Sequence, residues 1–179
     1  MHDVLERALR VRLLIFDVDG VLTDGRLYFS DEGHEYKAFH SRDGQGMKAL
    51  QSTGVQIGII TGRTSQVVTR RMADLGVVHV YQGCHAKQEA LAQLLAATGC
   101  SATEAAYVGD DAPDLAVMRR VGLAIAVQDA DPLVKAHCHW VTPSPGGRGA
   151  ARDACDLIMK AQGTLEGVLK PYLELDDTR

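Results

Sequence analysis

The chain has few aromatic residues and no apolar run that is long enough to cross a membrane. Phe, Trp and Tyr make up 5% of the 179 residues, so we expect a core built from aliphatic side chains. Residues 1–12 lack the apolar centre of a signal peptide, and no later segment reaches the length of a membrane-spanning helix. We therefore predict a cytoplasmic protein that does not bind membranes.

Basic clusters and closely spaced cysteines are also missing. The formal net charge is −4 and there is no long run of Lys and Arg, which argues against a nucleic-acid partner. The four cysteines lie far apart with no C-x-x-C motif, so we predict buried free thiols rather than disulfides or a zinc site. They are Cys84, Cys100, Cys138 and Cys155.

The length and the 46% apolar composition fit one domain that covers residues 1–179. Apolar segments alternate with amphipathic ones, a pattern that is typical of a parallel sheet with right-handed crossovers. We predict an α/β fold, with a Rossmann-like parallel sheet flanked by helices. The predicted strands are residues 13–16, 55–60, 77–81, 105–108 and 123–127. The predicted helices are residues 4–12, 42–54, a segment between 63 and 76, one from about 86, then 113–121, 150–161 and 163–173.

Two segments stand apart from this alternation. Residues 25–39 place turn residues between short aromatic runs and predict a β-hairpin. The hairpin holds four of the nine aromatic residues, so we expect it to bury them against another surface. Residues 143–179 predict a flexible C-terminal loop and tail that includes the last two helices, and the final acidic residues are expected to fray.

The stretch LLIFDVDGVLTD, residues 13–24, carries the clearest chemical signal. A buried strand delivers Asp17 and Asp19 to a turn at Gly20, and burial disfavours ionised side chains. A divalent cation would offset that cost, and ligands bind beyond the carboxyl ends of strands in open α/β sheets. The alternative is a helix cap or an Asx turn made by one of the two aspartates.

Polar residues follow three further predicted strands. Thr61 follows the second strand, Lys87 opens the helix after the third, and Asp110 and Asp111 follow the fourth. Several carboxylates at one sheet edge repel one another unless a cation is bound, and hard oxygen ligands favour Mg²⁺. A hydroxyl and an ammonium beside them suit the oxygens of a phosphate group.

Each of these signals has an ordinary structural alternative. Thr61 fits a helix cap, and Lys87 fits a solvated surface lysine. Asp111 and Asp114 fit a capping pair for the helix that contains Pro113. The common position at one sheet edge favours a site over four unrelated roles.

The chain resembles the haloacid dehalogenase superfamily of phosphohydrolases along nearly its whole length. The motifs are DVDGVLTD from Asp17, then Thr61, Lys87 and GDDAPDL from Gly109. There is no room for a cap domain, which is typical of the capless branch. Within that branch, FHSRDGQGMK, ITGR, YQGCHAK, YVGDDAPDLAVM and GGRGAARDACDLIM resemble the family of 3-deoxy-D-manno-octulosonate 8-phosphate phosphatases.

The resemblance implies roles for the strand-end residues. Asp17 would attack phosphorus and form an aspartyl phosphate, while Asp19 would act as general acid and then as general base. The Asp17 carboxylate, the Asp19 backbone carbonyl and Asp110 would hold Mg²⁺, with Asp111 just behind them. Thr61 and Lys87 would bind phosphoryl oxygens, and all four of Asp17, Asp19, Thr61 and Lys87 count as catalytic.

The resemblance also implies a substrate site and an assembly. The substrate-binding set is Asp19, His40, Ser41, Arg42, Asp43, Gly44, Lys48, Arg63, Arg71 and Lys87. An arginine fork suits the carboxylate of a keto acid, although Arg71 also fits a solvated helix face beside Arg70. The implied assembly is a homotetramer in which hairpins meet. A neighbour's tail, with Arg148 and Arg152, would close the site, unless these arginines serve only solubility.

The implied function is Mg²⁺-dependent hydrolysis of 3-deoxy-D-manno-octulosonate 8-phosphate, a step in making lipopolysaccharide precursors. One alternative is a phosphatase of a nine-carbon keto sugar acid 9-phosphate. A second is a catalytically silent tetramerisation module, although a pure scaffold has no need for the set of Asp17, Asp19, Thr61, Lys87 and Asp110.

Overall fold

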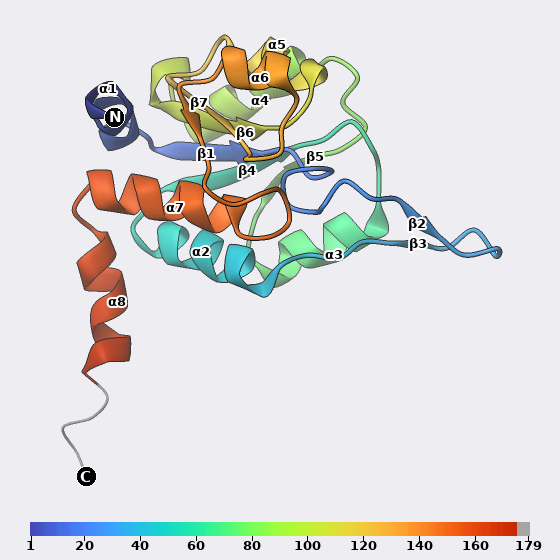
Figure 1. The fold of residues 1–179 in the computed structure, drawn as a ribbon, viewed down its shortest axis with the longest axis horizontal. Coiled ribbons are helices and arrows are strands. Elements are labelled where there is room, and N and C mark those ends of the chain that lie inside the picture. Colours follow the sequence, from blue (N-terminus) through green and yellow to red (C-terminus); the bar gives the residue numbers. More distant parts are fainter. Residues whose placement is uncertain (175–179) are drawn as a thin grey trace.

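A computed structural model describes residues 1–174 and contains one central sheet of six parallel strands (Figure 1). The strand order is β5-β4-β1-β6-β7-β8. The strands are β1 (Leu13–Phe16), β4 (Gln56–Ile60), β5 (His79–Tyr81), β6 (Ala105–Gly109), β7 (Leu123–Ala126) and β8 (Trp140–Val141). This arrangement confirms the predicted Rossmann-like α/β fold.

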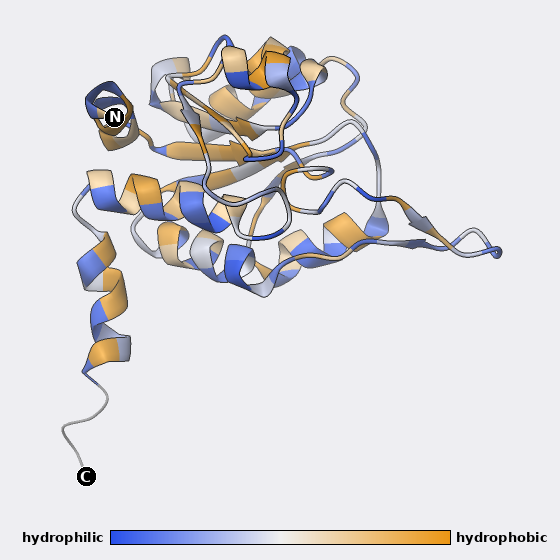
Figure 2. Cartoon of the chain, in the orientation of Figure 1, coloured by the Kyte–Doolittle hydropathy of each residue, from blue (hydrophilic) through white to orange (hydrophobic). Residues whose placement is uncertain are grey.

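The central strand β1 fixes the position of the rest of the sheet. All four of its residues are buried, as expected for an apolar run covered on both faces (Figure 2). It pairs with β4 on one side and β6 on the other, so that Leu13 is opposite both Gln56 and Ala105. The chain order reverses beside β1, and a crevice for ligands is expected at the carboxyl ends of the strands there.

Helices cover both faces of the sheet. In Figure 1, α4, α5 and α6 lie over one face, and α2, α3 and α7 lie over the other. The helices are α1 (His2–Leu9), α2 (Ser41–Ser52), α3 (Gln66–Asp74), α4 (Lys87–Thr98), α5 (Leu115–Met118), α6 (Pro132–Ala136), α7 (Ala150–Ala161) and α8 (Leu165–Leu173), with 3-10 turns η1 (Ala102–Glu104) and η2 (Ala112–Asp114). The core is aliphatic as expected, and within the described chain Phe16 and Tyr107 are its buried aromatic residues.

Several boundaries differ from the predicted ones. The first helix begins at His2 rather than at residue 4, and α2 begins at Ser41 because the side chain of His40 caps it. Helix α6 and strand β8 were not predicted. They contain five and two residues, which is too short for a periodic pattern to show in the sequence.

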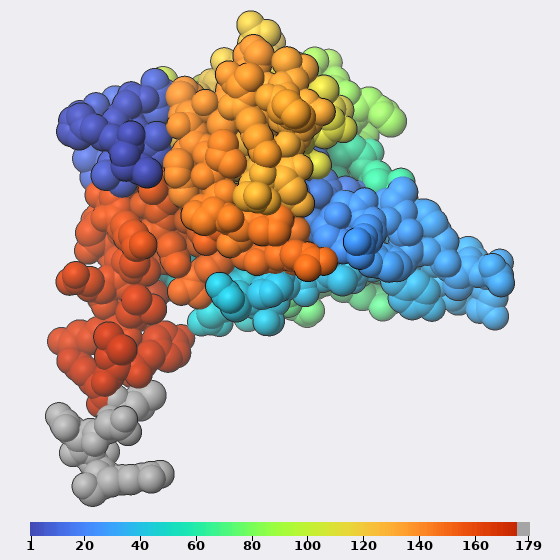
Figure 3. Space-filling model, viewed as in Figure 1, coloured from blue at the N-terminus to red at the C-terminus, as the bar shows by residue number. Residues whose placement is uncertain are grey.

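The predicted hairpin forms and extends away from the body of the protein (Figures 1 and 3). It contains β2 (Tyr28–Phe29) and β3 (Glu35–Tyr36), which pair antiparallel. Phe29 and Tyr36 are 59% and 57% exposed, whereas Phe39 packs against the core. Within one chain, the expected burial of the hairpin aromatics is therefore met only for Phe39.

The C-terminal segment has fixed contacts as well as a protruding helix. The predicted flexible loop, residues 143–149, is held by the backbone NH groups of Gly146 and Gly147, which donate to Asp129 Oδ1 and the Val21 carbonyl at 2.8 Å each. Helix α8 contains no buried residue and projects from the body (Figure 1). The predicted fraying of the last residues lies outside the described residues.

The cysteines and the helices can be compared with the predictions for disulfides and for membrane-spanning segments. All four cysteines are free, as predicted, but only Cys100 and Cys155 are buried, while Cys84 and Cys138 are half-buried. Within residues 1–174, no helix combines the length and the apolar composition that crossing a membrane requires.

Candidate active site

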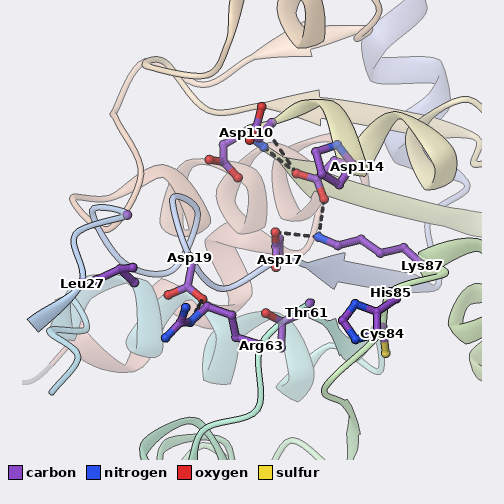
Figure 4. Close-up of a pocket in the computed structure, with 14 residues that line it drawn as sticks. Asp17, Asp19, Leu27, Thr61, Arg63, Cys84, His85, Lys87, Asp110 and Asp114 are labelled. Atoms are coloured by element: carbon purple, nitrogen blue, oxygen red, sulfur yellow. Dashed lines mark hydrogen bonds and ion pairs between the residues drawn. The ribbon is translucent and has the colours of Figure 1, made fainter. Parts of the chain in front are cut away.

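A pocket of about 500 Å³ opens at the carboxyl ends of β1, β4 and β6 (Figure 4). Its position beside the reversal of strand order is the one expected for a ligand site in this fold. The structure brings seven of the predicted site residues into its lining: Asp17, Asp19, Thr61, Arg63, Lys87, Asp110 and Asp111. The other lining residues are Gly25, Leu27, Gly62, Cys84, His85, Pro113 and Asp114.

A buried lysine joins two carboxylates at the base of the pocket. Lys87 Nζ donates to Asp17 Oδ2 and to Asp114 Oδ1, both at 2.7 Å, and the lysine is 6% exposed. Tyr107 also donates to Asp114 Oδ1 at 2.6 Å. The other oxygen of Asp17 accepts the Val18 NH at 2.6 Å. Asp17 is thus held from two sides, and the suggestion that Lys87 is a solvated surface residue is wrong.

Asp114 was not predicted as a site residue, although its capping role was considered. Its Oδ2 accepts the backbone NH groups of Asp110 and Asp111 at 2.9 and 3.3 Å, and Asp111 caps the turn in return. The capping alternative is therefore confirmed for this pair. Gly109 permits the close approach, because a Cβ there would lie 2.6 Å from Asp114. The sequence did offer one indication of this contact, because Asp114 lies four residues after Asp110.

The acidic cluster shifts the pKa values of its members. Burial, together with the charges of Asp114 and Asp17, raises the pKa of Asp110 to about 8. Burial and the Asp114 carboxylate also raise the pKa of Asp17, although Lys87 opposes this effect. Burial alone would lower the pKa of Lys87, but the two carboxylates raise it above its usual value. The cluster is thus rich in negative charge that a cation would stabilise.

The residues present fit a hard divalent cation. One carboxylate oxygen each from Asp17, Asp110 and Asp114 lies within 4.8 Å of the others. Asp110 Oδ1 is buried and has no hydrogen-bond partner among the described residues, whereas both oxygens of Asp114 are occupied by donors. Asp110 reaches this position only because residue 20 is Gly, since a Cβ there would lie 2.0 Å from Asp110 Oδ2. Within residues 1–174, Asp110 Oδ1 is therefore the buried carboxylate oxygen of this cluster that has no donor, while Asp17, whose oxygens accept from Lys87 and the Val18 NH, lies beside it.

The side chain of Asp19 points away from that cluster and toward the hairpin. Its Oδ1 accepts a hydrogen bond from Lys37, and its Oδ2 lies 3.8 Å from Arg63 Nε. Arg63 Nη2 also donates to Glu35 Oε1 at 3.0 Å. Lys37 and Glu35 were missed in the sequence analysis, because nothing local indicates that a hairpin residue reaches the end of β1.

Thr61 lies at the end of β4 and is 2% exposed. Its backbone NH donates to the Tyr81 carbonyl at 3.0 Å. The suggestion that it caps a helix is wrong, because the N-cap of α3 is Ser65. Thr61 instead lines the pocket.

The remaining predicted substrate-binding residues do not line this pocket: His40, Ser41, Arg42, Asp43, Gly44, Lys48 and Arg71. Asp43 is buried, and its carboxylate accepts the backbone NH groups of Gly149 and Arg152 at 3.3 and 2.9 Å. Burial raises the pKa of Asp43. In this chain Asp43 therefore joins α2 to the start of α7.

The predicted basic residues have different surroundings. The Arg71 guanidinium lies 5.9 Å from the centre of the Phe39 ring and packs against Gly44, so it is more than a solvated helix face. Lys48 lines a groove between α2 and α8. The Nε of Arg152 donates to both oxygens of Asp156, at 2.8 and 2.9 Å, whereas Arg148 is exposed.

Comparison with known proteins shows that the chain is similar to hydrolases. A family model described as haloacid dehalogenase-like hydrolase matches residues 76–152. The chain is 48% identical over 165 residues to the 3-deoxy-D-manno-octulosonate 8-phosphate phosphatase of Yersinia pestis, covering 92% of this chain and 88% of the relative. It is 46% identical over 164 residues to the enzyme of the same name from Escherichia coli K12, covering 92% and 87%.

Solved structures are similar over the same length. A crystal structure of the 3-deoxy-D-manno-octulosonate 8-phosphate phosphatase from Moraxella catarrhalis, in complex with a magnesium ion, a phosphate ion and a KDO molecule, has a TM-score of 0.94. It is 38% identical and covers 96% of this chain and 99% of its own. The structure of the Yersinia pestis phosphatase has a TM-score of 0.91 at 48% identity, with 92% and 89% covered.

Proposed function

The chain belongs to the haloacid dehalogenase-like hydrolases, and on this premise we propose that it hydrolyses 3-deoxy-D-manno-octulosonate 8-phosphate to the free sugar acid and inorganic phosphate. The observation that carries the proposal is the buried arrangement of Asp17 and Lys87 at the base of a strand-end pocket. A chain that served only as a scaffold would gain nothing from burying these charges, since each is costly to desolvate.

The nucleophile in this proposal is Asp17. One carboxylate oxygen attacks phosphorus while the bond from phosphorus to the sugar oxygen breaks, which leaves an aspartyl phosphate. The hydrogen bonds from Lys87 and from the Val18 NH fix the carboxylate before the reaction. This fixed orientation lowers the entropic cost of reaching the transition state.

Asp19 is proposed to handle the proton in both steps. As an acid it protonates the departing sugar oxygen, and as a base it accepts a proton from the water that attacks the aspartyl phosphate. That second attack breaks the bond between phosphorus and Asp17 and releases inorganic phosphate. The position of Asp19 in the lining of the pocket, two residues from Asp17, supports this division of roles.

A magnesium ion is proposed to be held by the carboxylates of Asp17 and Asp110 and the Asp19 backbone carbonyl, with Asp111 just behind them. When bound, the ion supplies positive charge that stabilises the phosphoryl oxygens. Thr61 supplies a hydroxyl donor at the pocket wall, and Lys87 supplies the ammonium at its base. The orphaned oxygen of Asp110 supports this assignment.

The sugar acid is proposed to contact a second group of residues: His40, Ser41, Arg42, Asp43, Gly44, Lys48, Arg63 and Arg71. Apart from Arg63, these do not line the pocket of their own chain. We therefore propose a homotetramer in which hairpins meet and the C-terminal segment of a neighbouring subunit completes the site, with Arg148 from its loop and Arg152 from the start of its α7. The exposed hairpin aromatics support such an assembly, because large exposed apolar patches mark interfaces.

The proposed setting is the cytoplasm, in the synthesis of a lipopolysaccharide precursor. The competing substrate is a nine-carbon keto sugar acid 9-phosphate, which presents the same carboxylate and phosphate ester. The two substrates differ only in the length and substitution of the sugar.

A phosphate-release assay with both sugar phosphates, with and without Mg²⁺, tests the proposal. We expect Mg²⁺-dependent turnover with the eight-carbon ester as the preferred substrate, and no turnover by the Asp17→Asn control. A preference for the nine-carbon ester would support the competing substrate. If neither ester releases phosphate with Mg²⁺, the silent tetramerisation module becomes the better description.

A further inference from the structure

We propose that Lys37 is a positioning residue, through which the hairpin holds the carboxylate of Asp19 in the orientation that proton transfer requires. This inference rests on the proposed function, which makes Asp19 the acid and the base. It adds a residue from a distant part of the chain to that site, and it gives the hairpin a role in the chemistry itself.

Lys37 lies directly after β3, and its side chain turns inward. The side chain is 2% exposed, and Nζ donates to Asp19 Oδ1 and lies 3.4 Å from Glu35 Oε1. Lys37 does not line the pocket. Its influence on a bound phosphate ester is therefore exerted through Asp19.

Four charged groups of alternating sign form a closed ring at this point. Lys37 contacts Asp19 and Glu35, while Arg63 Nη2 lies 3.0 Å from Glu35 Oε1 and Arg63 Nε lies 3.8 Å from Asp19 Oδ2. The two oxygens of Asp19 thus have different partners. Oδ1 is held by Lys37 of the hairpin, and Oδ2 faces Arg63, which lines the pocket together with Asp19 (Figure 4).

Charge and burial explain why this orientation persists. A buried ammonium is unfavourable unless it is paired, so Lys37 keeps the Asp19 carboxylate beside it. Arg63 is a weaker constraint on Asp19, because it is 44% exposed at the side chain and donates its close hydrogen bond to Glu35. The position of a reacting group matters greatly, since a displacement of about 1 Å lowers rates by about 10²-fold.

The test compares esters that differ in their need for an acid. The variants are Lys37→Met, which removes the charge, and Lys37→Arg, which keeps it, with Lys160→Met as a matched control on the exposed side of α7. Single-turnover measurements with Mg²⁺ follow release of the sugar and release of nitrophenolate from 4-nitrophenyl phosphate. The nitrophenolate ion leaves without a proton, whereas the sugar oxygen needs one.

For Lys37→Met we expect sugar release to slow by about 10²-fold or more. A rate factor of about 10² is the lower end of what a general acid contributes. In the same variant, nitrophenolate release should slow far less, and KM for the sugar phosphate should change little. The variant Lys37→Arg keeps the charge and should therefore retain most of the wild-type rate of sugar release. Lys160→Met should match the wild type. Equal slowing with both esters would overturn the proposal, because Lys37 would then only support the fold.

A double variant, Lys37→Met with Glu35→Gln, keeps the ring balanced in charge and guards against misfolding. It should show the same difference between the two esters. Recovery of sugar release in the double variant would overturn the proposal, since Lys37 would then serve only to neutralise Glu35. The proposal would also be overturned if neither Lys37→Met nor the double variant folded. If the proposed function itself is wrong, the result can be distinguished from these outcomes, because the folded wild-type protein would then release no sugar.

Discussion

Replacing Asp110 with asparagine should stabilise the protein when metal is absent, and the gain should grow as the pH rises. The pKa of Asp110 is raised to about 8 in the folded protein, against 3.8 for an unperturbed carboxyl group. The folded state therefore keeps a proton that the unfolded chain has lost. A raised carboxyl pKa means that stability is fully present below pH 3.8 and is lost as the pH rises toward 8.

The magnitude follows from the same two values. They give a cost of about 5 kcal/mol at pH 8 and about 2 kcal/mol at pH 5 when solvent screening is left out. The Asp110 side chain is partly open to water, which screens part of this cost. We expect about half of each, so Asp110→Asn should gain about 2–3 kcal/mol at pH 8 and about 1 kcal/mol at pH 5.

Urea denaturation with a chelator present measures this effect, with the single tryptophan, Trp140, as the fluorescent probe. Asp74→Asn is the matched control, because Asp74 is exposed at the end of α3 and should show no comparable pH dependence. Saturating Mg²⁺ should stabilise the wild type and not Asp110→Asn, since binding to the folded state shifts the unfolding equilibrium. A pH-independent difference, or a less stable variant at pH 8, would refute the electrostatic reasoning.

Three further predictions concern the reaction and the assembly. Asp17→Asn should abolish phosphate release while thermal denaturation shows a folded protein, and wild-type turnover would exclude Asp17 as the nucleophile. Asp19→Asn should slow sugar release by about 10²–10⁴-fold and nitrophenolate release less, and equal losses in a stopped assay would remove the argument for a general acid. Replacing Tyr28 and Phe29 together with Ser should lower both the oligomer mass by light scattering and the turnover of the sugar phosphate. An unchanged tetramer with unchanged kinetics would show that the hairpin is needed neither for assembly nor for turnover of the sugar phosphate.

The strand-end residues of the site could be predicted from the sequence alone. Asp17, Thr61 and Asp110 each follow an apolar segment, and parallel strands bring their carboxyl ends to one edge of the sheet. Their convergence is therefore a consequence of local patterns and a common topology. The family was predictable for the same reason, because its motifs lie at these strand ends.

Some ordinary structural roles were harder to separate from functional ones. Asp114 looked like a cap, and it is one, yet its other oxygen also binds Lys87 and Tyr107. Asp43 was predicted to bind substrate, and in the chain it joins α2 to α7. A side chain with two oxygens can serve two purposes, and the sequence does not say which partner each oxygen meets.

Other contacts were decided only by the tertiary structure. Lys37 reaches from the hairpin to Asp19 beyond the end of β1, and Tyr107 points from the middle of β6 into the acidic cluster. Neither residue belongs to a strand-end pattern, and each is defined by side-chain direction after the chain has folded. The sequence by itself therefore determined which residues end the strands and carry the charge. Packing decided which of those charges are paired and which oxygens stay free, because pairing depends on distances between segments that are far apart in the chain.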